Sequence, residues 1–499
     1  MSFDGFGSDL ASRVTPFNKH KVDGSAPDGK PAYVLCWLQQ ALRAHDNPTI
    51  DAAIEIGNAL GLPVVVYHGL RQDYPHASDR LHRFILGASR DVERGCEARG
   101  LRAATYVETP DHREKGLLYR LASRAAAVVT DEQFCFVARW QLESFAASHP
   151  GSVLAVDAAR LVPTRTLPDD IRGTSGFRKR SGERRDMHVA EAFDFEPRVA
   201  RFDGDLGFRE AHNSAASDED LDALVSSCAI DHTLPPGAFE ASREAATARL
   251  ADFVANDLPR YADDRNNPAR EDSVSCLSPY LHFGVLGPRE IVRAVDAAEG
   301  KRNPRWKFLD ELLTWREWFH YLIHQADVPE SFEEVPQKAR ASLLAHADDE
   351  RPHLYTLSEL LHGETHDETW NAAQRQWLAT GYMHNNLRMY WSKKLIEWTP
   401  HPHDGWVTAL YINDRLSIDG RDPSTYGNMQ ATFGRSKPAY REQEVYGWVA
   451  PKTDGALRKR PDVPQWLADW ARSDVPRISV PNAAFVATGF ETRLMAGEG

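Results

Sequence analysis

The first third of the chain alternates short, uninterrupted hydrophobic runs with segments of helical periodicity. Runs of this kind predict strands buried on both faces of a parallel sheet, and they occupy residues 33–38, 63–67, 103–107, 126–130 and 153–156. Helices are predicted between them at 47–60, 81–99 and 113–123. The order predicts a doubly wound parallel-sheet α/β domain over residues 30–165. This domain has no Gly-x-Gly-x-x-Gly sequence, which argues against a nicotinamide cofactor on the standard fingerprint.

The pattern changes after residue 165. Residues 166–230 are charged and contain Pro and Gly, which predicts a linker passing over the surface. From 231 to 475 apolar positions recur with a helical period and strand-like runs are rare, so this part predicts an all-helical second domain. Residues 476–499 have little periodicity and predict a tail or a late docking segment.

Composition narrows the class of protein. A chain of 499 residues is too long for one core, and 42% hydrophobic with 10% aromatic residues excludes general disorder. No apolar run approaches the roughly 20 residues of a membrane helix, and the N-terminus does not resemble a signal peptide. Five scattered cysteines without Cys-x-x-Cys spacing predict a reducing cytoplasm, with no disulfide framework and no metal site.

The net charge of -13 argues against a protein that coats nucleic acid along its whole surface. Two local patches are nevertheless basic. The first contains Arg172, Arg178, Lys179, Arg180, Arg184 and Arg185, and the second contains Arg435, Lys437, Arg441, Lys452, Arg458, Lys459 and Arg460. A solvated loop explains either patch when it is taken alone, and only a neighbouring pocket would favour a nucleic-acid site.

Hydroxyl groups gather at a predicted helix start around Ser275, Leu277 and Ser278. Hydroxyls and the free backbone N–H groups of a helix N-terminus suit phosphate oxygens. An ordinary helix cap with Pro279 in the first turn explains the same residues equally well.

Glu311 and Trp315 are four residues apart, on one face of a predicted helix. A carboxylate beside an aromatic ring can hydrogen-bond and stack a flat polar ligand. The alternative is a helix edge packed on the core.

The block from 370 to 426 combines tryptophans with a cluster of charged and amide side chains. Trp370, Trp391 and Trp398 lie here with Arg388, and residues 413–423 read Asn-Asp-Arg-Leu-Ser-Ile-Asp-Gly-Arg-Asp-Pro. A buried cluster of this kind must face something polar. Core packing alone also accounts for the tryptophans, because Trp391 and Trp398 are one heptad apart.

Five colinear blocks of the second domain resemble the signature sequences of the photolyase and cryptochrome family. They are residues 277–284, 311–317, 365–374, 388–398 and 413–423. The blocks are most similar to those of class II cyclobutane pyrimidine dimer photolyases. The first domain is similar to the family's α/β antenna domain in pattern more than in motif.

The resemblance implies an FAD in the helical domain, folded into a U shape. The residues around its phosphates would be Tyr261, Ser275, Leu277 and Ser278. Asn413 corresponds to the family's asparagine beside flavin N5, and Arg388 with Asp419 to the charged pair alongside the isoalloxazine. An amide can turn its carbonyl toward the N5–H of reduced flavin, which an apolar residue could not do.

The resemblance also implies a reaction, in which light-excited reduced FAD donates an electron to a thymine dimer flipped out of UV-damaged DNA. Glu311 is expected to hydrogen-bond the lesion, and Trp315 to stack on it. The expected electron relay consists of Trp370, Trp391 and Trp398, and the expected DNA contacts are Arg265, Asn266, Arg435, Lys437 and Arg441. A second, antenna chromophore and a monomeric state belong to the same expectation, although no motif identifies the chromophore.

The chain departs from the class II pattern near the expected substrate. Ala431 and Pro438 stand where the family carries a second clamping tryptophan and a His-Asp, His-Asn-Asn at 384–386 replaces His-Gly-Phe, and Ser-Thr at 424–425 replaces Asn-Gly. An unpaired Arg265 would then need a new acceptor, such as a DNA phosphate. Repair of dimers, a cryptochrome-like light sensor and a flavoprotein without photochemistry remain open.

Overall fold

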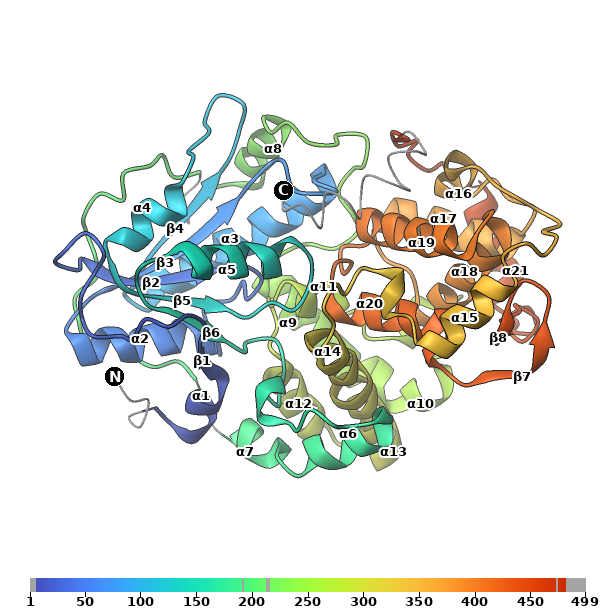
Figure 1. Cartoon of the computed structure of the whole chain (residues 1–499), viewed down its shortest axis with the longest axis horizontal. Helices are drawn as coiled ribbons and strands as arrows, with labels where there is room; N and C mark the ends of the chain where they lie inside the picture. The colour runs from blue at the N-terminus through green and yellow to red at the C-terminus, as the bar shows by residue number, and fades with distance from the viewer. Residues whose placement is uncertain (1–5, 191–192, 212–215, 473, 482–499) are drawn as a thin grey trace.

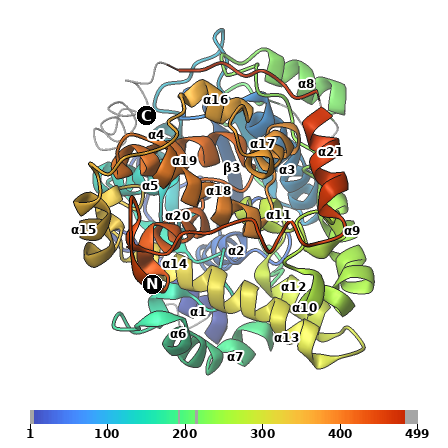
Figure 2. The same cartoon turned by 90° about the vertical axis from the view of Figure 1, so that its right-hand side faces the viewer.

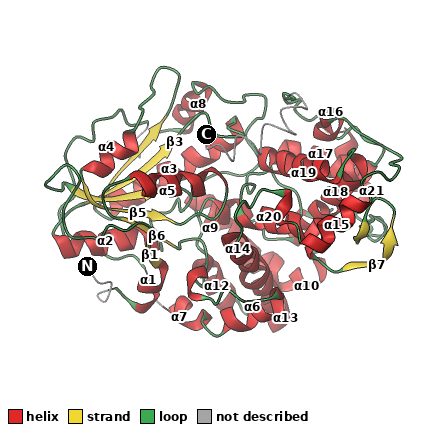
Figure 3. Cartoon of the chain, viewed as in Figure 1, coloured by secondary structure: helices red, strands yellow, loops and turns green. Residues whose placement is uncertain are grey.

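The computed structural model describes residues 6–190, 193–211, 216–472 and 474–481. An α/β part and a helical part occupy opposite ends of the molecule (Figure 1), and the colouring of Figure 3 separates them by secondary structure.

The α/β domain is built on one six-stranded sheet with the order β1-β6-β5-β2-β3-β4. Its strands are β1 (Val14–Pro16), β2 (Tyr33–Leu38), β3 (Val64–Leu70), β4 (Arg102–Val107), β5 (Ala125–Asp131) and β6 (Val153–Val156). Its helices are α1 (Ser8–Arg13), α2 (Pro48–Leu60), α3 (Asp79–Ala98), α4 (Leu117–Ser123) and α5 (Phe136–Ser148). Every residue of β2, β5 and β6 is buried, as expected for hydrophobic runs in the middle of an α/β fold.

Strands β2 to β6 pair in parallel and confirm the predicted α/β fold class. One strand was missed. β1 runs antiparallel to β6 at the sheet edge and lies before residue 30, where the predicted domain begins. A strand of three residues is too short to show a periodicity.

The segment predicted as a surface linker carries three helices: α6 (Gly173–Gly182), α7 (Arg185–Ala190) and α8 (Asp218–Ser226). Of these, α6 is docked rather than free. Its Phe177 is buried against Trp318 and Tyr321 of the helical domain, with ring centroids 5.7 and 5.8 Å away.

The helical domain follows, and its core surrounds a group of buried tryptophans. Its shorter or earlier helices are α9 (Arg243–Asp252), α10 (Tyr261–Asp264), α11 (Ser278–His282), α12 (Pro288–Asp296), α13 (Arg302–Asp310) and α14 (Glu317–His324). The later helices are α15 (Gln337–Ala345), α16 (Leu357–His362), α17 (Glu368–Thr380), α18 (Asn385–Trp398), α19 (Pro402–Leu416), α20 (Pro423–Gln430) and α21 (Val463–Arg472). A π-helical stretch, Glu311–Arg316, joins α13 to α14.

The prediction of an all-helical second domain was wrong at one place. A hairpin of β7 (Pro438–Gln443) and β8 (Gly447–Val449) extends from its outer end. The chain leaves the helical course at Gly434, where φ is 129°, and β8 then packs on α15. Five of the six residues of β7 are exposed or half-buried, so no hydrophobic run signals the strand.

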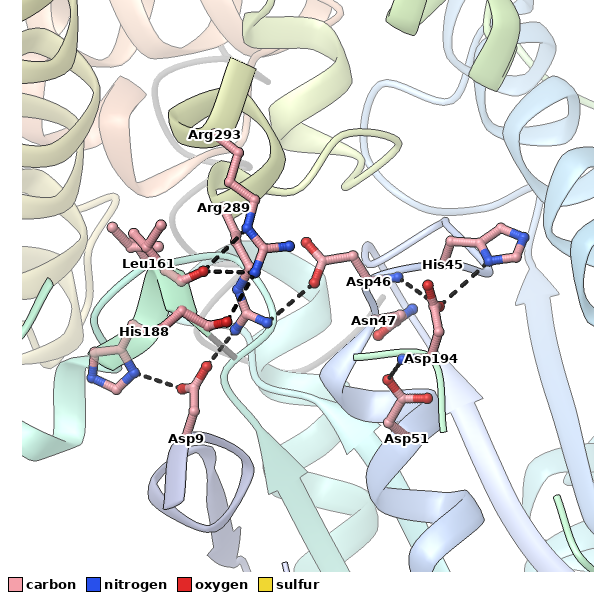
Figure 4. Close-up of polar contacts among 12 residues, drawn as sticks. Asp9, His45, Asp46, Asn47, Asp51, Leu161, His188, Asp194, Arg289 and Arg293 are labelled. Carbon is pink, nitrogen blue, oxygen red and sulfur yellow. Dashed lines mark hydrogen bonds and ion pairs between the residues drawn. The ribbon is translucent and has the colours of Figure 1, made fainter. Parts of the chain in front are cut away.

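A buried polar cluster joins the N-terminal helix, the connector and the helical domain (Figure 4). Asp9 of α1 accepts hydrogen bonds from Arg13 Nε at 2.8 Å and from Arg289 of α12, and His188 Nδ1 of α7 lies 2.5 Å from its carboxylate. All four side chains are buried. These contacts hold segments together that are up to 280 residues apart in sequence.

Among the residues that the structure describes, no helix has both the length and the apolar character needed to cross a bilayer.

Candidate functional site

An ion pair between Arg388 and Asp419 lies at the centre of the helical domain. Arg388 Nη2 of α18 is 2.7 Å from Asp419 Oδ1, in the loop after α19. The hydroxyl of Ser278 donates to the other carboxylate oxygen at 2.6 Å. The guanidinium carbon lies 5.4 Å from the ring centroid of Trp377 and 5.7 Å from that of Tyr382. The charge is therefore held in place by a carboxylate and by two aromatic faces.

Asn413 provides an acceptor at the same site. Its side chain is 1% exposed, and its Nδ2 donates to Asp414 Oδ1 at 3.2 Å and to Thr425 Oγ1 at 3.5 Å. Within the described residues its amide oxygen has no hydrogen-bond partner, so this oxygen is available to accept one. The backbone of Gly420 passes so close that a Cβ there would lie 2.9 Å from the carbonyl oxygen of Asn413. The arrangement fits a buried ligand that carries an N–H group, as a reduced flavin does.

The structure brings only some of the residues predicted around a phosphate close to one another. Ser278 bonds Asp419, while Ser275 Oγ accepts from Leu277 N at 3.4 Å. Tyr261 is buried between Phe253 and Phe308, and this burial raises its pKa to about 12. Their role beside phosphates stays a prediction.

Glu311 and Trp315 lie on the π-helical stretch, a geometry that often marks functional sites. Glu311 Oε1 is 2.9 Å from Arg265 Nη1 and 2.8 Å from Lys307 Nζ. Our expectation of an unpaired Arg265 was therefore wrong, because Glu311 already supplies a carboxylate. Trp315 is 38% exposed, which is unusual for an indole and leaves a ring face for a ligand. Asn266 is exposed beside them, and its carbonyl accepts from Asn386 Nδ2 at 3.3 Å.

A line of buried indoles leads away from the Arg388 site. The rings of Trp391 and Trp370 are stacked with centroids 5.8 Å apart, and Trp370 meets Trp398 edge to face at 5.4 Å. Trp391 Nε1 donates to Gln374 Oε1 at 2.8 Å, so this ring is fixed by a hydrogen bond as well as by packing.

Two further groups extend this line, and neither was identified from the sequence. Trp377 contacts Trp391 edge to face at 5.2 Å and carries Arg388 above its ring. The sequence feature that could have identified Trp377 is its position seven residues after Trp370 on α17. At the other end Trp398 meets Tyr355 at 5.3 Å and His366 at 5.4 Å, and the hydroxyl of Tyr355 is hydrogen-bonded to His366 Nδ1.

The altered clamp residues lie at the start of the hairpin region. Ala431 packs beside Trp318 and Phe319, and Pro438 opens β7 in an exposed position. Arg435 is held by Gln430 Oε1 at 2.9 Å, whereas Lys437 and Arg441 are exposed and form no ion pair in the described part of the chain.

A cleft of about 1390 Å³ lies between the two domains. The ends of β2, β3 and β4 line it on one side and α19 on the other, and Ser479, Val480 and Pro481 form part of its rim. Three of its residues, His76, Phe136 and Arg421, have positive φ angles of 69°, 58° and 58°. Such strain in non-glycine residues clusters at binding sites, and ligands of open α/β sheets bind at the carboxyl ends of the strands. No motif in the sequence pointed to this cleft.

No family model matches the chain. A curated deoxyribodipyrimidine photo-lyase from Methanothermobacter thermautotrophicus is 32% identical over 451 residues, which cover 88% of this chain and 94% of the relative. A Synechocystis cryptochrome structure has a TM-score of 0.61 at 17% identity and covers 94% of this chain and 99% of its own. An archaeal photolyase structure from Sulfolobus tokodaii, described as holding two FAD molecules, has a TM-score of 0.61 at 16% identity and covers 92% and 94%. The two structures share the fold, and the curated relative shares both sequence and length; this chain therefore belongs to the photolyase/cryptochrome family.

Proposed function

We propose that this protein is an enzyme that uses light and FAD to split cyclobutane pyrimidine dimers in UV-damaged DNA. The observation that carries the proposal is the indole line from Trp391 through Trp370 to Trp398, which Trp377 connects to the Arg388–Asp419 pair. A photochemical electron donor that must be kept reduced needs such a relay. The relative from Methanothermobacter thermautotrophicus, a deoxyribodipyrimidine photo-lyase by name, supports the same activity.

FAD would be held by Arg388, Asp419 and Asn413 along its ring system, with Ser278 and Tyr261 nearer to its phosphates. When bound and reduced, FAD would supply reversible, light-driven one-electron chemistry at the dimer. Asn413 offers its unpartnered amide oxygen to an N–H group, and Arg388 places a fixed positive charge beside the electron-rich ring.

At the mouth, Glu311 and Trp315 would receive the flipped-out dimer. Trp315 offers an exposed ring face for stacking. The carboxylate of Glu311 would hydrogen-bond to the edges of the pyrimidines. Its ion pairs with Arg265 and Lys307 keep this carboxylate oriented. Positioning, together with the exclusion of water, is what these side chains contribute.

Repair of a defined substrate tests the proposal. The FAD-loaded protein would be reduced and exposed to blue light with DNA that carries one thymine dimer, and dimer loss followed by chromatography. Light-dependent restoration is expected in duplex DNA, and a protein that binds FAD and photoreduces it without any restoration would overturn the proposal.

A blue-light sensor related to cryptochromes is the second candidate, because Ala431 and Pro438 alter the expected lesion clamp. The sensor would keep photoreduction through the indole line and lose repair. Replacing Ala431 with Trp separates the two functions, since a repair enzyme with a weakened clamp should gain affinity for dimer-containing DNA, whereas a sensor should not.

We further infer that the cleft between the domains holds a second, light-harvesting chromophore. The volume of the cleft, the positive φ angles of three residues that line it and its position at the strand ends support this inference. The second FAD named for the Sulfolobus tokodaii structure supports it as well. The identity of the chromophore stays open. A light-action spectrum of repair with a maximum that FAD alone does not explain would support the inference, and a pure flavin spectrum in protein from its native source would contradict it.

A monomeric protein of the cytoplasm remains our prediction. None of the five cysteines forms a disulfide, which supports a reducing compartment.

A further inference from the structure

The first basic patch of the sequence lies beside the segment that carries Glu311 and Trp315. Helix α6 packs against the π-helical stretch, and Figure 2 shows it below α14. Ile171 N donates to the hydroxyl of Tyr321 at 3.1 Å, and Arg185 Nη2 donates to the carbonyl oxygen of Leu313 at 2.9 Å. The patch is therefore fixed against the element that carries Glu311 and Trp315.

The closest link is a two-pronged ion pair next to Glu311. Arg178 Nε lies 2.8 Å from Asp310 Oδ1, and its Nη2 lies 3.1 Å from Oδ2. Asp310 immediately precedes Glu311 in the chain. Phe177, next to Arg178, is buried in the core, whereas Lys179 and Arg180 on the other side of Arg178 are exposed.

These outward residues are cations that the fold itself does not use. Arg172, Lys179 and Arg180 are exposed, and none of them has an ion-pair partner within the described residues. The chain carries a net charge of -13, so cations without an internal role are informative when they gather at one place.

Helix α13 continues the same surface. Trp306 and Arg302 lie four and eight residues before Asp310, and therefore on the helix stripe that meets Arg178. The indole of Trp306 is 50% exposed, and Arg302 and Lys301 are exposed and form no ion pair with other described residues. An exposed ring between free cations is typical of a surface that contacts nucleic acid.

We infer that α6 and the start of α13 form a second DNA-binding arm, which grips the duplex on one side of the flipped-out lesion through its backbone phosphates. Arg172, Lys179, Arg180, Lys301 and Arg302 contact phosphates, and Trp306 packs against the sugar-phosphate edge. The arm rests on the proposed function, because the lesion site at Glu311 and Trp315 sets where the duplex lies.

Geometry gives the reach of the arm. Arg302 is nine residues before Glu311, which is about 14 Å along the helix axis, or about four base pairs of duplex. In the hairpin region, Arg441 is carried by β7 and Lys437 directly precedes this strand, at a different place from α6. The contacts of the two regions with DNA can therefore be separated by trimming one duplex arm at a time.

The test measures the affinity of the FAD-loaded protein for a duplex with one central dimer and 12 base pairs on each side. The double variant Lys179→Glu/Arg180→Glu should weaken binding about tenfold or more at 0.1 M salt, and the slope of log affinity against log salt should fall by about two. The matched control is Lys19→Glu/Lys21→Glu, which makes the same charge change at exposed positions of the α/β domain and should alter neither quantity.

Two further measurements make the test specific. Trimming the duplex to three base pairs on one side should weaken the parent protein as much as the double variant, and the variant should then be insensitive to that trimming. Glu183→Lys, which adds a cation at the exposed end of α6, should tighten binding.

The outcomes separate this inference from the proposed function. If the parent protein repairs dimers but the α6 variant and the control bind equally, the arm does not exist and the repair function stands. If the parent protein shows no preference for dimer-containing DNA at all, the proposed function fails first. Unchanged dimer loss per absorbed photon in the variant at saturating DNA is the expected sign that α6 acts in binding alone.

Discussion

The indole rings of Trp370 and Trp391 lie almost parallel, 10° apart, with their centroids separated by 5.8 Å. They come from two helices, α17 and α18, and a hydrogen bond from Trp370 Nε1 to the carbonyl oxygen of Trp391 at 3.1 Å fixes their relative position. Rings at this spacing are close enough for an electron to move between them. The pair is the inner part of the relay on which the proposed photochemistry depends.

Replacing Trp391 with Phe should block photoreduction of bound FAD while leaving repair by chemically reduced protein. The relay is interrupted at Trp391, whereas the lesion site is untouched. The measurement is the rate of flavin bleaching under blue light with an external reductant, and we expect at least a tenfold decrease. Trp406→Phe is the matched control, because Trp406 is equally buried but contacts Phe332 and Phe433 instead of the relay. Loss of FAD from the Trp391 variant would mean that the residue is structural.

Replacing Glu311 with Gln should lower the yield of dimer repair about tenfold, since a charged hydrogen bond to the lesion contributes about 1.5–3 kcal/mol. FAD content should not change, because Glu311 bonds Arg265 and Lys307 at the mouth. The yield is measured as dimers split per absorbed photon. Glu333→Gln, at an exposed position, serves as the control. Equal yields for the parent and the Glu311 variant would remove this residue from the reaction.

Replacing Lys393 with Met should stabilise the protein at neutral pH by about 1–4 kcal/mol. Lys393 is 4% exposed, its Nζ has no hydrogen-bond partner in the described part of the chain, and burial together with the nearby charge of Lys452 lowers its pKa to about 7.

The sign of the pH effect follows from this shift. The folded pKa lies below the unfolded one, so the buried charge destabilises the fold below pH 7 and the penalty disappears as pH rises toward 10.5. Denaturant unfolding at pH 7 and pH 9 should show stability rising with pH in the parent protein and less so in the variant. Lys394→Met, which removes a half-buried pair with Glu397, is the control. A variant less stable than the parent at pH 7 would show that Lys393 has a partner.

Replacing Asp9 with Asn should destabilise the fold by about 3–5 kcal/mol, because it leaves Arg13 and Arg289 buried without their carboxylate. Burial alone would raise the pKa of Asp9, but the hydrogen bond of His188 and the charges of the two arginines outweigh it and leave the pKa below its usual value. The stability that Asp9 contributes is therefore present above about pH 4 and lost as pH falls further. Thermal unfolding at pH 7 and below pH 4 measures this contribution, and Asp111→Asn, at an exposed position, is the control. The loss of stability caused by Asp9→Asn should be smaller below pH 4 than at pH 7.

Local patterns were enough for the buried strands of the α/β domain and for the residue types of the site. The hydrophobic runs of the α/β domain coincide with β2 to β6 to within three residues at either end, because a strand buried on both faces must be apolar throughout. Likewise, Arg388, Asp419 and the three tryptophans stand out within one short block, since rare residue types close together in sequence are visible without a fold.

Only the tertiary structure decided the contacts between residues that are far apart in the sequence. The pairing of Arg265 with Glu311, the insertion of Trp377 beside Trp391, the docking of α6 against Asp310 and the inter-domain cleft all join segments from different elements. A periodicity reports which face of a segment is buried and carries no information about which other segment covers it. For that reason the residue types of the site can be predicted from the sequence. The contacts between distant residues and the shape of the surface are decided only by the tertiary structure.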